Sequence, residues 1–303
     1  TSSEFFIQNL VPVVSFAEEK IITNKDSVIL SGFAESVLIS RTASILDVEY
    51  SIDGGRKWAK ADPKDGVFDS KKEEFRINLV GLKEGFYKVL ARASDNRGFR
   101  GEGSMILIVD LGPPRAVSVF SPKEREVFGY KDDLDLDKAG IQLNIRGSSE
   151  PDNKIIITNG DVLFEGESKS DGRFSIEITI RKHGENVLKI SSIDRAGNKS
   201  EIEASLTLIL NNPPDLKFLR PKAAGAIGGI YDVVFEIQDR DLDAISETIL
   251  SYRKRGSALQ NIIARNPEVN TVSFNAGNLT EGFYEFILEA SDGVSRNSLT
   301  QEF

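Results

Sequence analysis

The sequence contains no cysteine, and its 303 residues include only one histidine, one methionine and one tryptophan. The absence of cysteine excludes disulfides, thiolate metal sites and cysteine nucleophiles, although it does not fix the cellular compartment. No apolar run approaches the roughly 20 residues that a membrane helix needs, so we expect no membrane insertion. Neither a signal peptide nor an initiator methionine is present, which indicates a processed form or a piece of a longer protein.

Clusters of positive charge are also lacking. The net charge is −9, with 15 basic against 17 acidic residues in 1–112, 14 against 17 in 113–212, and 9 against 13 in 213–303. Phosphate-binding surfaces need gathered lysine and arginine, so we expect no nucleic-acid partner. Apolar residues make up 40% of the chain and charged residues 28%, which predicts a folded chain with apolar cores.

What the sequence does contain is an internal repeat. Three segments align without gaps at their centres: 82–98, 180–198 and 279–295. Their glycines fall at 85, 184 and 282 and their last aspartates at 95, 194 and 292, with spacings of 99 and 98 in both series. A period near 100 residues corresponds to a whole β-sandwich domain. The repeat therefore predicts three tandem sandwich domains in an elongated all-β array.

Each copy of the repeat has the alternation of a half-buried strand. Tyr87, Val89 and Ala91 point to one side, and Lys88 and Arg92 point to the other. The repeat glycines favour a turn with positive φ before this strand. A last strand then closes the module, at 105–109 in the first and 206–210 in the second, and a Pro-Pro pair follows each one. Because proline cannot continue a ladder, we place the boundaries after residues 112 and 212.

Other segments also have the sequence patterns of strands and turns. Residues 154–158 and 162–164 predict a hairpin around Asn159-Gly160, and strands are expected at 141–145 and 174–180. The acidic stretch 132–137 is interpreted as a polar loop. The best helix-like pattern is 241–253, but it aligns with two strands and a loop of the other modules, so we predict no helix there.

The outer modules resemble known bacterial sandwich families. VEYSIDGGRKW (48–58) with GLKEGFYKVLARASDNRG (81–98) is similar to fibronectin III-like repeats of bacterial surface proteins. It also resembles the sandwich that follows the sensor propeller of bacterial hybrid two-component receptors. Residues 234–243 and 250–252 of the third module resemble the same type.

The middle module resembles a second type. DGRFSIEITI (171–180) and HGENVLKISSIDRAGNKS (183–200) are similar to bacterial immunoglobulin-like repeats. Two related outer modules are therefore expected to flank a different central one. The resemblance implies an extracytoplasmic location, in the periplasm or at the cell surface, and says little about activity.

Two motifs carry possible chemistry in the first module and at a linker. Ser51-Ile-Asp53-Gly-Gly55-Arg-Lys-Trp58 matches most of the Asp-box of sialidase propellers, but Lys57 replaces the usual threonine and the motif occurs once, so we interpret it as a hairpin turn with Trp58 packed beside it. An exposed Trp58 would favour carbohydrate stacking. Asn-Asn-Pro-Pro at 211–214 resembles a cadherin linker, although the matching acidic signature is missing.

A third motif concerns metals. Asp239, Asp241 and Asp243 alternate as calcium ligands in loops do, without the glycine and distal glutamate of an EF-hand. Two interpretations stay open, a solvated turn and a calcium site, and no other cofactor is expected. We predict that His183, in the turn before the second repeat strand, is an exposed loop residue.

A catalytic site is hard to assemble from these residues, although acidic residues are plentiful and paired-carboxylate hydrolysis stays open. No Gly-x-Ser-x-Gly elbow accompanies the single histidine, and no phosphate-binding glycine motif occurs. We therefore expect a non-catalytic spacer, or a region that binds protein or polysaccharide, within a larger bacterial protein. The alternatives are the sensor region of a receptor and accessory modules of a polysaccharide-degrading enzyme.

Overall fold

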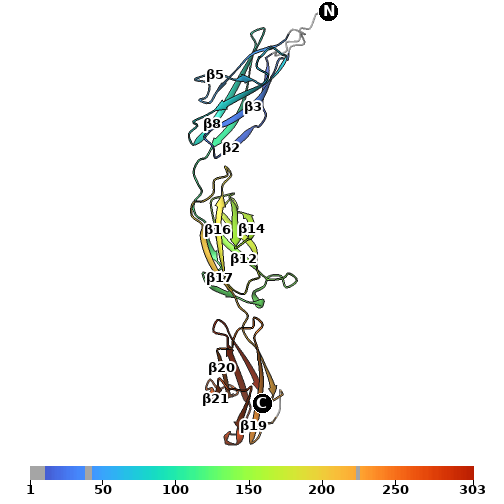
Figure 1. Ribbon diagram of the computed structural model, residues 1–303, viewed down its shortest axis with the longest axis vertical. Helices are drawn as coiled ribbons and strands as arrows, with labels where there is room; N and C mark the ends of the chain where they lie inside the picture. The colour runs from blue at the N-terminus through green and yellow to red at the C-terminus, as the bar shows by residue number, and fades with distance from the viewer. Residues whose placement is uncertain (1–10, 38–42, 223–225) are drawn as a thin grey trace, which may run out of the picture.

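The computed structural model describes residues 11–37, 43–222 and 226–303. Six β-sheets form three modules that lie end to end along the longest axis (Figure 1). The helical segments in the described ranges are two short 3-10 turns, η1 (Tyr130–Asp132) and η2 (Ala276–Asn278). The prediction of an all-β, elongated array of three sandwiches is confirmed. Residues 1–10 of the predicted first module lie outside the described ranges.

The first module packs a four-stranded sheet, in the order β1-β3-β7-β6, against a five-stranded sheet, in the order β2-β9-β8-β4-β5. β2 pairs with β9 in parallel, and the other pairs are antiparallel. The strands are β1 (Val13–Phe16), β2 (Lys20–Thr23), β3 (Val28–Glu35), β4 (Ile45–Ser51), β5 (Ala59–Lys60), β6 (Asp62–Pro63), β7 (Lys72–Leu79), β8 (Gly85–Asp95) and β9 (Arg100–Val109).

The second module has sheets in the orders β10-β12-β15 and β11-β17-β16-β13-β14, and β11 again pairs in parallel with the last strand. Its strands are β10 (Ser118–Ser121), β11 (Glu126–Phe128), β12 (Ile141–Ser148), β13 (Lys154–Asn159), β14 (Val162–Glu167), β15 (Arg173–Ile180), β16 (Gly184–Ile193) and β17 (Ala204–Leu210). The predicted strands at 141–145, 174–180 and 206–210 are confirmed.

The third module has sheets in the orders β18-β19-β22 and β21-β20-β23-β24. Its strands are β18 (Asp215–Arg220), β19 (Ile230–Gln238), β20 (Glu247–Lys254), β21 (Asn261–Arg265), β22 (Thr271–Asn275), β23 (Tyr284–Ser291) and β24 (Arg296–Glu302). Residues 241–246 form a loop and β20 follows, so the expectation of no helix at 241–253 is confirmed.

Each module has its own apolar core between its two sheets, made by alternate residues of the strands. In β15, Phe174, Ile176, Ile178 and Ile180 are buried, whereas the residues between them are exposed or, at Thr179, half-buried. Burial of such a side chain contributes about 1.5–3 kcal/mol, so the period of two in the sequence fixes which face packs inward. In the third core, the rings of Phe286 and Phe303 stack with their centroids 3.9 Å apart.

The repeated strand is β8, β16 and β23 in the three modules. The repeat glycine, at the start of β8 and β16 and two residues before β23, has φ values of 151° at Gly85, 81° at Gly184 and 155° at Gly282, the region that only glycine adopts without strain. The aspartate that ends the repeat organises the following turn: Oδ1 of Asp194 accepts hydrogen bonds from the backbone of Ala196 and Asn198 at 2.8 and 2.9 Å. Asp95 and Asp292 do the same in their own turns, so the motif is structural.

One sequence expectation differs from the structure. In the β13-β14 hairpin, Asn159 pairs with Val162, so the two turn residues are Gly160 and Asp161 and not Asn159-Gly160. Gly160 supplies the positive φ of 59° that such a turn needs. In both the first and the second module a parallel strand extends one sheet, and the described residues of the third module contain no such strand, although residues 223–225 lie outside the described ranges. The expectation that the two outer modules are the related pair stays a prediction.

Candidate functional site at the junction of the second and third modules

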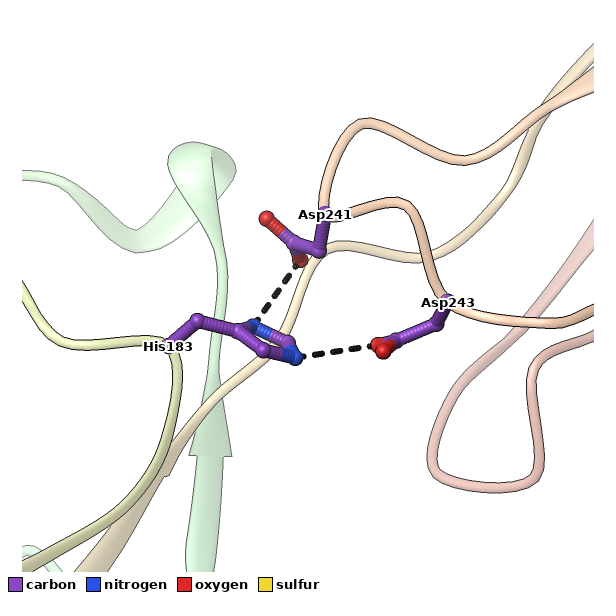
Figure 2. Close-up of side chains that lie close together, drawn as sticks. All are labelled: His183, Asp241 and Asp243. Atoms are coloured by element: carbon purple, nitrogen blue, oxygen red, sulfur yellow. Dashed lines mark ion pairs between the residues drawn. The ribbon is translucent and has the colours of Figure 1, made fainter.

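The turn between β15 and β16 and the loop between β19 and β20 meet where the second module joins the third (Figure 2). The turn carries His183, and the loop carries Asp241 and Asp243. The turn lies at the end of the second module that faces the third, and the loop lies at the end of the third module that faces the second. The contact is therefore between modules, and it depends on how the linker at 211–214 sets one module on the other.

Both ring nitrogens of His183 face carboxylates. Nδ1 lies 3.5 Å from Oδ2 of Asp241, and Nε2 lies 3.0 Å from Oδ2 of Asp243. The side chain of His183 is 41% exposed, that of Asp241 is 15% exposed and that of Asp243 is 33% exposed, so the group lies at the edge of the junction. The prediction that His183 is an exposed loop residue is confirmed, but no sequence pattern indicated its partners in the next module.

The loop of the third module holds its aspartates by local hydrogen bonds. Oδ1 of Asp239 accepts from the backbone N–H of Asp241 at 2.9 Å and of Asp243 at 3.2 Å. Between the two, Leu242 takes a positive φ of 64° and its side chain is 91% exposed. This conformation is unfavourable for a branched apolar residue, and it turns the loop so that Asp241 and Asp243 both approach His183.

The linker holds Asp241 in place. The backbone N–H of Asn212 donates to Oδ2 of Asp241 at 2.6 Å, and its side-chain amide donates to Oδ1 at 3.0 Å. On the other side, Oδ1 of Asn212 accepts from the backbone N–H of Tyr130, at the start of η1, at 2.7 Å. One asparagine therefore connects a turn of the second module to a loop of the third.

The neighbouring Asn211 makes a second link. Its buried side-chain amide donates to Oδ2 of Asp292 and to Oγ of Ser295, both at 2.9 Å. Burial raises the pKa of the Asp292 carboxyl, but hydrogen bonds from the Ser295 backbone and from Asn211 outweigh it and hold that pKa below its ordinary value. The guanidinium of Arg240 lies 4.4 Å from the ring centre of Tyr130 and completes the junction.

The predicted calcium ligands occupy different environments. Asp241 and Asp243 face His183, whereas Oδ1 of Asp239 is engaged by its own loop. Oδ2 of Asp239 is buried and has no hydrogen-bond partner in the described part of the chain. The structure thus brings together two of the three aspartates and adds a histidine that sequence spacing could not associate with them. A calcium site at Asp239, Asp241 and Asp243 stays a prediction.

The Asp-box-like motif lies in the first module, away from this junction. Oδ1 of Asp53 accepts from the backbone of Arg56 and Lys57 at 3.0 and 2.9 Å, and the bond from Lys57 is the main cause of its lowered pKa. Trp58 is half-buried: its Nε1 donates to the carbonyl of Gly55 at 2.9 Å, and the guanidinium of Arg92 lies 3.8 Å from its ring centre. Arg92 therefore already occupies a ring face that carbohydrate stacking would use.

The acidic stretch 132–137 begins in η1 and continues as a loop. Oδ1 of Asp133 accepts from the backbone of Asp135 at 3.1 Å and of Gln142 at 2.9 Å. Lys138 forms an ion pair with Asp135 at 2.9 Å. These carboxylates are used within the loop, and the interpretation of the stretch as a polar loop is confirmed. No helix of the described ranges has the length and apolar character needed to cross a membrane.

Comparison with known proteins places the middle module. The bacterial Ig domain family matches residues 131–207, and no curated protein matches the chain. Among solved structures, the fibronectin(III)-like modules of CbhA from Clostridium thermocellum are 16% identical, with a TM-score of 0.41 over 65% of this chain and 94% of that one.

Two further solved structures, both longer than the CbhA modules, are matched over most of this chain. A Ca²⁺-stabilised ice-binding adhesin of an Antarctic bacterium is 13% identical, with a TM-score of 0.39 over 96% of this chain and 72% of that one. Domains A168–A170 of titin are 12% identical, with a TM-score of 0.32 over 97% and 99%. Scores at this level carry no conclusion about binding or activity. The chain is a tandem array of three β-sandwich modules, and its middle module is similar to the bacterial Ig domain family.

Proposed function

We propose that the chain is a non-catalytic structural spacer of a bacterial extracytoplasmic protein, in the periplasm or at the cell surface, with modules that divide at 112/113 and 212/213. The observation that supports it best is the pair of linker asparagines. Asn211 and Asn212 each donate from the second module's end to carboxylates of the third, Asp292 and Asp241. Such bonds hold one module at a fixed angle to the next.

The linkers also limit bending through their covalent structure. Each contains a Pro-Pro pair, and proline fixes φ near −65° and disfavours helical conformations of the residue before it. A short linker of this kind is a semi-rigid spacer, in contrast to a glycine-serine linker. Three sandwiches joined in this way keep whatever lies at the two ends of the chain apart.

The proposal contains no catalytic step. Both ring nitrogens of the single histidine, His183, face aspartate carboxylates. Neither contact is with the hydroxyl nucleophile that a Ser-His-Asp arrangement needs. The charges of each module are mildly acidic and mixed, which supports neither nucleic acid nor an anionic membrane surface as a partner.

An interaction region for protein or polysaccharide is the second candidate, and one surface supports it. A groove at the far end of the third module is lined partly by apolar side chains, among them Ile227, Leu279, Tyr284 and the 69% exposed Phe283. Sensor modules of a receptor and accessory modules of a polysaccharide-degrading enzyme would use a surface of the same kind.

Small-angle X-ray scattering of the full chain tests the spacer role. We expect the distance distribution of a stiff rod, unchanged between low and high salt, because the two asparagine links are hydrogen bonds at buried or partly buried positions. The variant carrying both Asn211→Ala and Asn212→Ala should give a broader and shorter distribution. A compact particle, or a wild-type curve already typical of freely jointed domains, would refute the proposal.

A further inference from the structure

The side-chain cluster at the junction has the composition of a metal site. One nitrogen of His183 and one oxygen each of Asp241 and Asp243 all lie within 4.8 Å of one another. The histidine comes from the second module and the two aspartates from the third (Figure 2). A ligand held by all three side chains would therefore bridge two modules.

The donor types select the ion. Imidazole nitrogen combined with carboxylate oxygen suits zinc and similar divalent transition metals, whereas calcium takes six to eight oxygen ligands. We propose that His183, Asp241 and Asp243 bind a divalent transition-metal ion of the zinc class across the junction of the second and third modules. Three protein ligands leave a fourth position for water.

The distances fit such an ion after a small closure. Ligands that lie about 2.0–2.2 Å from zinc in a tetrahedral arrangement are about 3.3–3.6 Å from one another. The two contacts of His183 measure 3.5 Å to Asp241, which is within that range, and 3.0 Å to Asp243, which is below it. Only one ring nitrogen of His183 can bind the ion. The three ligand atoms, which now lie within 4.8 Å of one another, therefore have to close to about 3.3–3.6 Å.

The surroundings of Asp241 support a ligand role. Metal-binding carboxylates are usually held by hydrogen bonds from outside the site, which orient them and maintain their charge. Asn212 provides this for Asp241 with its backbone N–H at 2.6 Å and its side-chain amide at 3.0 Å. A carboxylate has further lone pairs, so these bonds leave Asp241 able to coordinate.

A second observation comes from the same loop. Oδ2 of Asp239 is shielded from solvent and has no hydrogen-bond partner in the described ranges. A buried carboxylate oxygen without a donor is unfavourable, and a nearby cation compensates its charge. This oxygen belongs to the same loop that presents Asp241 and Asp243 to His183.

Isothermal titration calorimetry on the full chain, stripped of metal with a chelator, tests this directly. We expect one zinc ion per chain at neutral pH. Loss of an outer-shell partner alone costs about 10- to 100-fold in affinity, so His183→Ala and Asp243→Asn should each weaken binding by at least about 100-fold. Lys182→Ala, the exposed neighbour, is the matched control and should bind like the wild type. Cobalt(II) in place of zinc gives a visible absorption band that reports the ligand set.

A distance measurement shows whether the ion stiffens the junction. The chain has no cysteine, so Ser175→Cys and Asn261→Cys place one spin label on each side, at exposed strand positions. Zinc should narrow the distance distribution in the wild-type background and leave it unchanged with His183→Ala. Circular dichroism of each variant without metal shows that it is folded.

Three results would overturn the proposal. They are no zinc binding, zinc binding that survives His183→Ala, and binding of calcium in place of zinc, which would assign an oxygen-only site to Asp239, Asp241 and Asp243. None of these bears on the spacer role, because the scattering experiment is done without metal and the asparagine links do not involve His183.

Discussion

The two junctions of this rod are built from similar parts but are not equally connected. Between the first and second modules, the side-chain amide of Asn198 donates to the backbone carbonyl of Asp110 at 2.9 Å. Between the second and third, Asn211 donates to Asp292 and Ser295, and Asn212 to Asp241. Around these lie the stacking of Arg240 on Tyr130 and the contacts of His183.

The difference follows from the linker side chains. Each following module presents an aspartate-centred turn to the linker, at Asp194 or at Asp292. An ionised aspartate in the linker can only accept hydrogen bonds, so Asp110 contributes its backbone carbonyl and turns its carboxylate toward the N–H of Gly112 at 3.3 Å. Asparagine both donates and accepts, which lets Asn211 bond directly to a carboxylate. We expect the second junction to be the stiffer of the two.

Removing Asn211 should have the largest effect. Its side chain is buried, and Asn211→Ala leaves Oδ2 of Asp292 without its amide donor, a loss of about 1–3 kcal/mol. We expect a broader distance distribution between spin labels at Ser175→Cys and Asn261→Cys. Labels at Asn78→Cys and Ser175→Cys, which span the first junction, are the control and should not change. Equal widths at both junctions of the wild type would contradict the comparison.

Acid should loosen the second junction through Asp292. The folded-state pKa of its carboxyl lies below the ordinary value, so its contribution to stability is complete above the unfolded-state pKa of about 3.9. That contribution is lost as the pH falls through the lower folded-state value. Asp292→Asn should lower the melting temperature at pH 7 by up to about 4 °C, and the gap to wild type should shrink below pH 4. A gap that stays constant with pH would show that the charge of Asp292 does not act.

At the first junction, Asn198→Ala removes the one bond to Asp110 and also a bond within its own turn, to Oδ2 of Asp194. The bond to the Asp110 carbonyl joins two neutral groups, and its net contribution to stability is about 0.5–1.5 kcal/mol. We expect the Asn78→Cys and Ser175→Cys distribution to broaden less than the second junction does with Asn211→Ala. A larger broadening would reverse the order of the two junctions.

The smallest effect is expected from Arg240→Gln. Arg240 lies on the ring of Tyr130 and its Nε donates to Asp215 at 2.7 Å, but its side chain is 55% exposed. Exposed charges are screened by salt, so the variant should differ from wild type at low salt and coincide with it at 1 M salt. The width of the Ser175→Cys and Asn261→Cys distribution measures both conditions. A difference that persists at 1 M salt would mean that the stacking, not the charge, carries the contact.

Much of the fold could be read from local patterns because each pattern has one physical cause. The period of two in 174–180 predicted the buried face of β15, and the repeat glycines predicted turns with positive φ. The hairpin at 154–167 was predicted with its turn one residue early, because Asn159-Gly160 and Gly160-Asp161 are both acceptable turn pairs and only the pairing of Asn159 with Val162 chooses between them.

The candidate site was only partly predictable. Asp241 and Asp243 stood out by their alternation, but Asp239, which alternates with them, is engaged by its own loop. The sequence also suggested that the outer modules are the related pair, and this stays a prediction, because residues 223–225 of the third module lie outside the described ranges. Identity in one strand reports the packing of that strand and does not fix how many strands flank it.

The sequence by itself determined the three sandwiches, their cores and their repeated turns, because these depend on side chains close together along the chain or on one alternating strand. Tertiary structure alone decided that His183 meets Asp241 and Asp243, which belong to the next module. That encounter depends on the angle at which the linker sets two rigid bodies. Periodicity within a module carries no information about that angle, and the two linker asparagines fix it by bonding to both sides.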